Sequence, residues 1–167
     1  MQKEVQGVRM ASKLFISFAA TREFAECDYY FKLVVRRAVK ATLEYLDIKN
    51  DAEVSVTFCD NEHIRVLNKQ HRNKDSATDV LSFPMYDFAS EDEEMPEDEP
   101  LMLGDIVISI ERAKEQAKEI GNTFLEEIAF LVIHSMLHLL GYDHERSPED
   151  EEAQCKAQKE IVKTVEI

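Results

Sequence analysis

The sequence predicts a single α+β domain in which about four strands form a mixed sheet and about five helices pack against it. Two segments with different hydrophobic periods support this prediction. Apolar residues alternate with polar ones in segment 52–59, as in a strand, and recur at helical spacing in segment 27–46. A third segment, 123–140, is apolar almost all round, so we expect it to form a buried central helix.

The other elements follow from local signals. We expect strands at 13–18, 79–83 and 103–110, and helices at 61–70, 111–120 and from Ser147-Pro148 towards Val165. Asp60 is a suitable N-cap for the first of these helices, Pro84 stops the second strand, and Gly121 ends the helix before the central one. Thr123 and Glu126 have the spacing of a capping box, which places the start of the central helix.

Length and composition fit one globular domain, 1–167, with 44% hydrophobic and 32% charged residues. Residues 1–12 carry no fold signal, so we expect poor order there, and Met10 is an alternative start residue. The cysteines, Cys27, Cys59 and Cys155, form neither a CxxC pattern nor a disulfide framework. No apolar run approaches the roughly 20 residues of a membrane span. We therefore expect a soluble cytoplasmic protein with no membrane partner.

The formal net charge is −14, and seven of the acidic residues lie between 91 and 99. We interpret segment 88–100 as a solvated acidic loop. The net charge of −14 argues against a generic nucleic-acid coat protein, but without those seven charges the balance would be −7, which tempers this objection. Any nucleic-acid binding must therefore come from a local basic cleft.

Three of the five histidines follow the pattern His-x3-His-x5-His, at His134, His138 and His144. Residues four apart share a helix face, roughly 5–6 Å from each other, so His134 and His138 can bind one metal ion. Gly141 can end the helix and reverse the chain, which would bring His144 back as a third ligand. Three neutral imidazoles suit zinc and leave a fourth position for water. We predict one catalytic Zn²⁺ per chain; the alternative is three structural histidines.

The spacing His138-x-x-Gly141-x-x-His144 is also the second half of the metzincin peptidase signature. Those peptidases carry a glutamate after the first histidine as general base, and this chain has Ser135 there. A serine hydroxyl has no useful basicity near neutral pH. A zinc peptidase would therefore need an unconventional base.

Three motifs in this order, TDVLSFP at 78–84, LGDI at 103–106 and HSMLHLLGYDH at 134–144, resemble the bacterial YbeY family. That family consists of zinc-dependent single-strand endoribonucleases that act in ribosomal RNA maturation and ribosome quality control. The resemblance extends over about 54–160. The chain departs from the family at Ser135, where glycine is usual, and near Cys155, where methionine is usual; neither position is a metal ligand.

The resemblance implies that the three histidines bind the metal and that Arg72 is important for activity. A guanidinium is always charged and can donate two hydrogen bonds to phosphate oxygens, which fits a phosphodiester transition state. The alternative is that Arg72 is a surface arginine. Asp143 can accept a hydrogen bond from a ligand imidazole or cap the turn, and both readings stay open.

The resemblance further implies cleavage of single-stranded RNA in ribosomal RNA processing, including 16S rRNA 3′ end maturation. The expected partners are single-stranded RNA, with ribosomal RNA as the expected kind, and the ribosome or small-subunit assembly proteins, but not DNA. A zinc peptidase and a non-catalytic ribosome-assembly factor with a structural zinc are the alternative functions. The sequence leaves open the general base, the physiological metal, the cleavage site and the oligomeric state.

Overall fold

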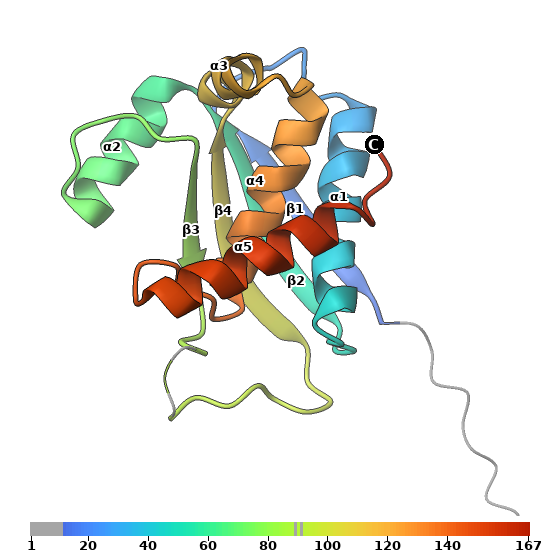
Figure 1. The fold of residues 1–167 in the computed structure, drawn as a ribbon. Helices are drawn as coiled ribbons and strands as arrows, with labels where there is room; N and C mark the ends of the chain where they lie inside the picture. The colour runs from blue at the N-terminus through green and yellow to red at the C-terminus, as the bar shows by residue number, and fades with distance from the viewer. Residues whose placement is uncertain (1–11, 89, 91) are drawn as a thin grey trace, which may run out of the picture.

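The computed structural model describes residues 12–167 except 89 and 91. The sequence predicts poor order for residues 1–12, and of these only residue 12 lies in the described part of the chain. Figure 1 shows the order of the elements along the chain. They are β1 (Leu14–Ala20), α1 (Tyr29–Tyr45), β2 (Ala52–Cys59), α2 (Asn61–Arg72), β3 (Val80–Pro84), β4 (Leu101–Ser109), α3 (Ile110–Ile120), α4 (Phe124–Leu139) and α5 (Pro148–Val162).

The sheet has the strand order β1-β2-β4-β3, in which β1, β2 and β4 run parallel and β3 runs antiparallel to β4. Val56 in the middle of β2 lies between Phe18 of β1 and Ile106 of β4. Parallel neighbours need a crossover connection, and α1 supplies the one between β1 and β2. The predicted α+β domain with a mixed four-stranded sheet is confirmed.

Side-chain caps move several predicted boundaries. The helix predicted at 27–46 begins at Tyr29, because the Asp28 side chain accepts a hydrogen bond from the Phe31 N–H. The strand predicted at 103–110 stops at Ser109, whose hydroxyl caps α3 by accepting from the Arg112 N–H. Ile110 therefore belongs to α3, and the prediction that placed it in the strand was wrong.

Helix α4 is the centre of the main core. It contacts α1, α3, α5 and the strands β3 and β4, and Figure 1 shows it lying between the sheet and α5. Ile133, Met136 and Leu137 are fully buried, and each such side chain contributes roughly 1.5–3 kcal/mol by leaving water. The capping box is formed as predicted, because Thr123 accepts from Glu126 N–H and the Glu126 carboxylate accepts from Thr123 N–H. The prediction of a buried central helix is confirmed.

A second, smaller core fixes α2 against the sheet. It contains Cys59, Ile64, Leu81 and Val107, with contributions from α2, β3 and β4 and from the end of β2. This packing holds α2 beside β3, and near the C-terminal end of α2 the His71 ring contacts Phe83 of β3, with ring centroids 4.8 Å apart. Among the described residues no single helix is long and apolar enough to span a membrane, although α3 and α4 together, bent by 111°, pass on length and composition.

Candidate metal centre

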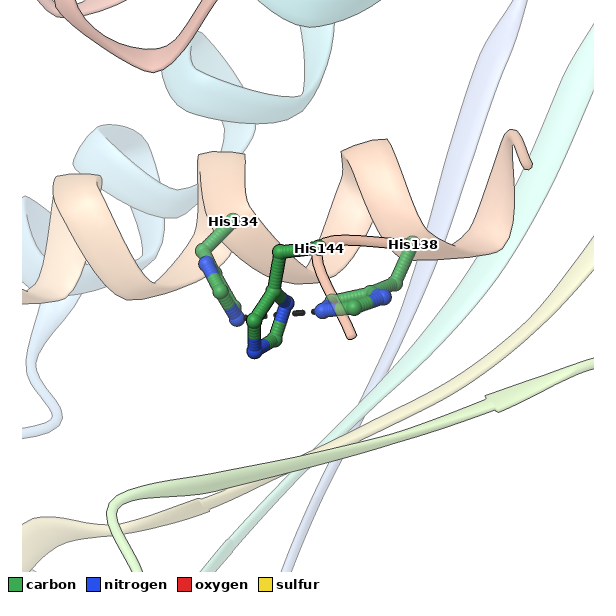
Figure 2. A group of neighbouring side chains, drawn as sticks. All are labelled: His134, His138 and His144. Atoms are coloured by element: carbon green, nitrogen blue, oxygen red, sulfur yellow. Dashed lines mark hydrogen bonds between the residues drawn. The ribbon is translucent and has the colours of Figure 1, made fainter. Parts of the chain in front are cut away.

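Three imidazoles converge at the C-terminal end of α4. His134 and His138 lie one turn apart on the helix, and Gly141, with φ 101°, reverses the chain so that His144 faces them (Figure 2). One ring nitrogen of each histidine lies within 4.8 Å of the others, and the Nε2 atoms of His134 and His138 are 3.2 Å apart. Two nitrogens bound to one tetrahedral zinc lie about 3.3 Å apart, so the spacing suits a shared ion.

The surroundings of the rings also fit a cation. The Nδ1 atom of His144 is buried and has no hydrogen-bond partner among the described residues, which is a costly state for a polar atom. A cation bound between the three rings would accept lone pairs from the ring nitrogens that face one another. Three imidazoles form a donor set that suits zinc, and the residues therefore fit the ion that the sequence predicts.

The candidate group has three members within the part of the chain that the structure describes. A closed structural zinc site would need a fourth protein ligand. None of the cysteines belongs to the group, and burial raises the pKa of the Cys27 and Cys59 thiols to about 12, which keeps them protonated. Three ligands with one open position are the arrangement of a catalytic rather than a structural site.

Burial favours the neutral form of His134 and His138. The pKa of His134 is lowered to about 4, first by burial and then by the neighbouring His138 and His144, while Asp79 opposes the change. The pKa of His138 is lowered as well, first by burial and then by His144, against the opposing effect of Asp143. A neutral imidazole has a free lone pair, so metal binding at neutral pH needs no deprotonation of these two rings.

Two glutamines of α5 contact the outer nitrogen of His134. The side-chain nitrogen of Gln158 lies 2.6 Å from His134 Nδ1, and that of Gln154 lies 3.3 Å away; both side chains are buried. A metal on Nε2 places the imidazole proton on Nδ1, which must then donate. The oxygen and nitrogen of an amide have nearly the same shape, so the Gln158 amide fits equally well when it is rotated by 180°. Its oxygen then faces His134 Nδ1 and accepts the hydrogen bond.

Arg72, the last residue of α2, reaches the same pocket as the histidines. Its Nη2 lies 3.4 Å from the Glu145 carboxylate, one residue after His144, and the arginine side chain is 37% exposed. The pocket has a volume of about 450 Å³. The fold therefore brings a permanent cation from α2 to the pocket that the three histidines line.

The structure places Asp143 in the turn. Its Oδ1 accepts a hydrogen bond from the Glu145 N–H at 3.0 Å, and its Oδ2 lies 4.0 Å from the Arg146 guanidinium. This matches the turn-capping alternative. The contact to a ligand imidazole that the sequence offered to Asp143 is made by Gln158. An i, i+4 pair of glutamines at the spacing of the histidine pair was the one signal in the sequence for this role.

The carboxylate of Asp79, at the start of β3, is occupied by structural hydrogen bonds. It accepts from the Val80 N–H at 2.8 Å and from the Gln116 side chain at 3.0 Å. Gln116 also donates to the buried Glu127 of α4, so this network ties β3 to α3 and α4. Asp79 forms part of the pocket wall, and its negative charge faces His134.

The chain is similar to known proteins along most of its length. The profile of the family described as Endoribonuclease YbeY matches residues 17–166. A protein named Endoribonuclease YbeY from Caldanaerobacter subterraneus is 53% identical over 124 residues, covering 70% of this chain and 76% of that protein. One of the same name from Bacillus cereus is 45% identical over 150 residues, covering 89% of this chain and 94% of that protein. The solution structure of a Thermotoga maritima protein is similar, with a TM-score of 0.58 and 28% identity over 90% of this chain and 89% of that one.

Proposed function

Because the chain belongs to the family of the endoribonuclease YbeY, we propose that it is a zinc-dependent endoribonuclease that cleaves phosphodiester bonds in single-stranded RNA. The observation that supports this proposal most strongly is the pocket in which three imidazoles and Arg72 lie together. Phosphoryl transfer needs a site that neutralises charge on the phosphate oxygens, and these groups supply it.

His134, His138 and His144 would hold the zinc ion. When bound, zinc supplies a Lewis acid for a phosphoryl oxygen and lowers the pKa of a bound water molecule. The protein contributes neutral, oriented ligands, with Gln158 fixing the ring of His134. These ligands leave the charge of the ion largely uncompensated, which favours binding of an anionic substrate.

Arg72 would bind the phosphate next to the metal. In the free protein it faces Glu145 in an exposed pair, and pairs of this kind contribute about 0–1 kcal/mol. A phosphate can accept two parallel hydrogen bonds from the guanidinium and carries more charge than a carboxylate. We therefore expect the substrate phosphate to displace Glu145, which until then holds the arginine close to its working position.

The alternative functions receive less support. The position that would carry a peptidase base is Ser135, which is fully buried. A non-catalytic factor with a structural zinc would need a closed site, whereas the candidate group among the described residues offers three ligands. The named relatives are endoribonucleases.

The finer parts of the proposal follow from the family. We propose ribosomal RNA as the substrate, including the 3′ end of 16S rRNA, and the ribosome or small-subunit assembly proteins as partners. Action on ribosomes places the protein in the cytoplasm. The net charge of −14 makes the protein as a whole repel RNA phosphates. Affinity for RNA must therefore come from a partner or from a local cleft.

The test is cleavage of a defined single-stranded RNA by freshly purified protein with measured metal content. His138→Ala should lose both zinc and cleavage, whereas Arg72→Ala should lose cleavage and keep zinc. Arg112→Ala is the matched control, because this arginine on α3 also pairs with carboxylates but lies outside the pocket. If wild-type protein holds one zinc ion but leaves RNA intact, even with ribosomes present, the proposed endoribonuclease activity is wrong.

A further inference from the structure

An aromatic pair forms part of the wall of the metal pocket. Tyr86 and Phe88, which follow β3, stack with ring centroids 4.8 Å apart and an interplanar angle of 18°. We propose that this pair is a nucleobase-binding subsite, on which an unpaired RNA base stacks while its phosphate lies at Arg72 and the metal. The inference rests on the proposed function and specifies how the substrate is recognised.

The pair is held in place before any ligand arrives. The Tyr86 hydroxyl accepts a hydrogen bond from the Met102 N–H at 3.3 Å, which attaches the ring to β4. Phe88 stacks on this anchored ring, and both side chains are half-buried, so each ring is partly exposed in the pocket. A preorganised ring loses little conformational freedom when a planar base adds to the stack.

The charges in the pocket indicate which part of a nucleotide lies where. The pocket wall carries four carboxylates and one arginine; the carboxylates are Asp79, Asp87, Asp143 and Glu145, and the arginine is Arg72. A phosphate is repelled by most of this wall and is favoured only beside Arg72 and the histidines. A base is neutral, so the aromatic part of the wall, next to Asp87, suits the base and not the phosphate.

Pocket size and stacking together account for selection of single strands. A volume of about 450 Å³ is within the range of small-molecule sites and suits roughly one nucleotide unit. A base inside a duplex is already stacked and paired, and it must be flipped out before it can reach a protein ring. Stacking on an aromatic side chain is worth about 5- to 100-fold in affinity per base and tolerates any base. The subsite therefore predicts single-strand preference with weak sequence preference.

The experiment uses the zinc-loaded full chain and compares Phe88→Leu with wild type. Leucine keeps apolar volume but removes the stacking face. Phe15→Leu is the control, because Phe15 on β1 is 64% exposed and lies outside the pocket. We expect Phe88→Leu to raise KM for a short single-stranded RNA about 5- to 100-fold. Zinc content should not change, and Phe15→Leu should behave as wild type.

A second substrate separates stacking from a structural role of the ring. Its cleavage site is first mapped with wild-type protein, and abasic residues are then placed on either side of that site. If Phe88 stacks a base, wild type and Phe88→Leu should cleave the abasic substrate with the same KM. Two results would contradict the base-stacking subsite: an unchanged KM of Phe88→Leu on intact RNA, or an equal rise in its KM on both substrates. Neither result would contradict the proposed nuclease activity. Wild-type protein that neither binds nor cleaves RNA would refute both.

Discussion

The side chain of Gln158 lies 2.6 Å from Nδ1 of His134, although the two residues are 24 positions apart in the chain. Helix α5 thus contacts a candidate metal ligand of α4. In many metal sites this place is taken by a carboxylate, which adds negative charge to the site. A neutral amide orients the imidazole without that charge, which suits a centre that must attract phosphate.

Replacing Gln158 by alanine should weaken zinc binding about 10- to 100-fold, because the Nδ1–H of His134 loses its acceptor and the ring loses its orientation. Gln158→Glu should restore tight binding, since a carboxylate accepts the same hydrogen bond. Zinc affinity is measured by competition with a chromophoric chelator, with the exposed Gln70→Ala on α2 as control. Equal affinities for wild type and Gln158→Ala would show that α5 does not position the ligand.

Removal of the carboxylate that faces Arg72 should improve substrate binding. Glu145 is 65% exposed, so Glu145→Gln should change the free energy of unfolding by less than about 1 kcal/mol. It frees the guanidinium for phosphate, and we expect KM for single-stranded RNA to fall a few-fold. Asp75→Asn is the control, because Asp75 pairs with Arg65 outside the metal pocket. A higher KM in Glu145→Gln would mean that the carboxylate assists the reaction.

The local pattern of the sequence was sufficient to predict α4 and its histidines. The apolar run, the capping box at Thr123, the helix-ending Gly141 and the His-x3-His spacing each depend on residues within two or three turns. The contacts made by Gln158 and by the Tyr86–Phe88 pair depend on how α5 and the segment after β3 pack. Packing of this kind is tertiary, and the i, i+4 spacing of Gln154 and Gln158 does not show which helix they face, so these residues were not predicted.

Stability of the metal-free protein should depend on pH through His134. Its pKa is about 4 in the folded protein against an ordinary value of 6.5, so the unfolded chain binds more protons between these values. Stability is therefore lost as the pH falls from about 6.5 to about 4, by about 3 kcal/mol from this group. Urea unfolding with a chelator present measures the change. His134→Gln removes the titrating ring and should flatten this part of the profile; an unchanged profile would contradict the assignment.

Gly104 of β4 makes a close backbone approach that shapes the pocket wall. Its φ is +131°, and a Cβ added there would lie 2.1 Å from the carbonyl oxygen of Phe83 on the paired strand β3. Gly104→Ala must therefore move the end of β3, from which the chain continues to Tyr86. We expect a loss of at least about 2–3 kcal/mol in unfolding free energy, together with weaker RNA binding.

Gly121→Ala is the matched control for this prediction. Gly121 also has a positive φ, +78°, but a Cβ there would meet no atom within 4 Å among the described residues. It should lose only about 1 kcal/mol, the cost of the backbone conformation, and should bind RNA as wild type does. Urea unfolding at fixed zinc concentration and fluorescence anisotropy with a labelled single-stranded RNA measure the two effects. Equal losses of stability in the two variants would show that β3 tolerates the added methyl group, and that the close approach of Gly104 to Phe83 does not hold the pocket wall in place.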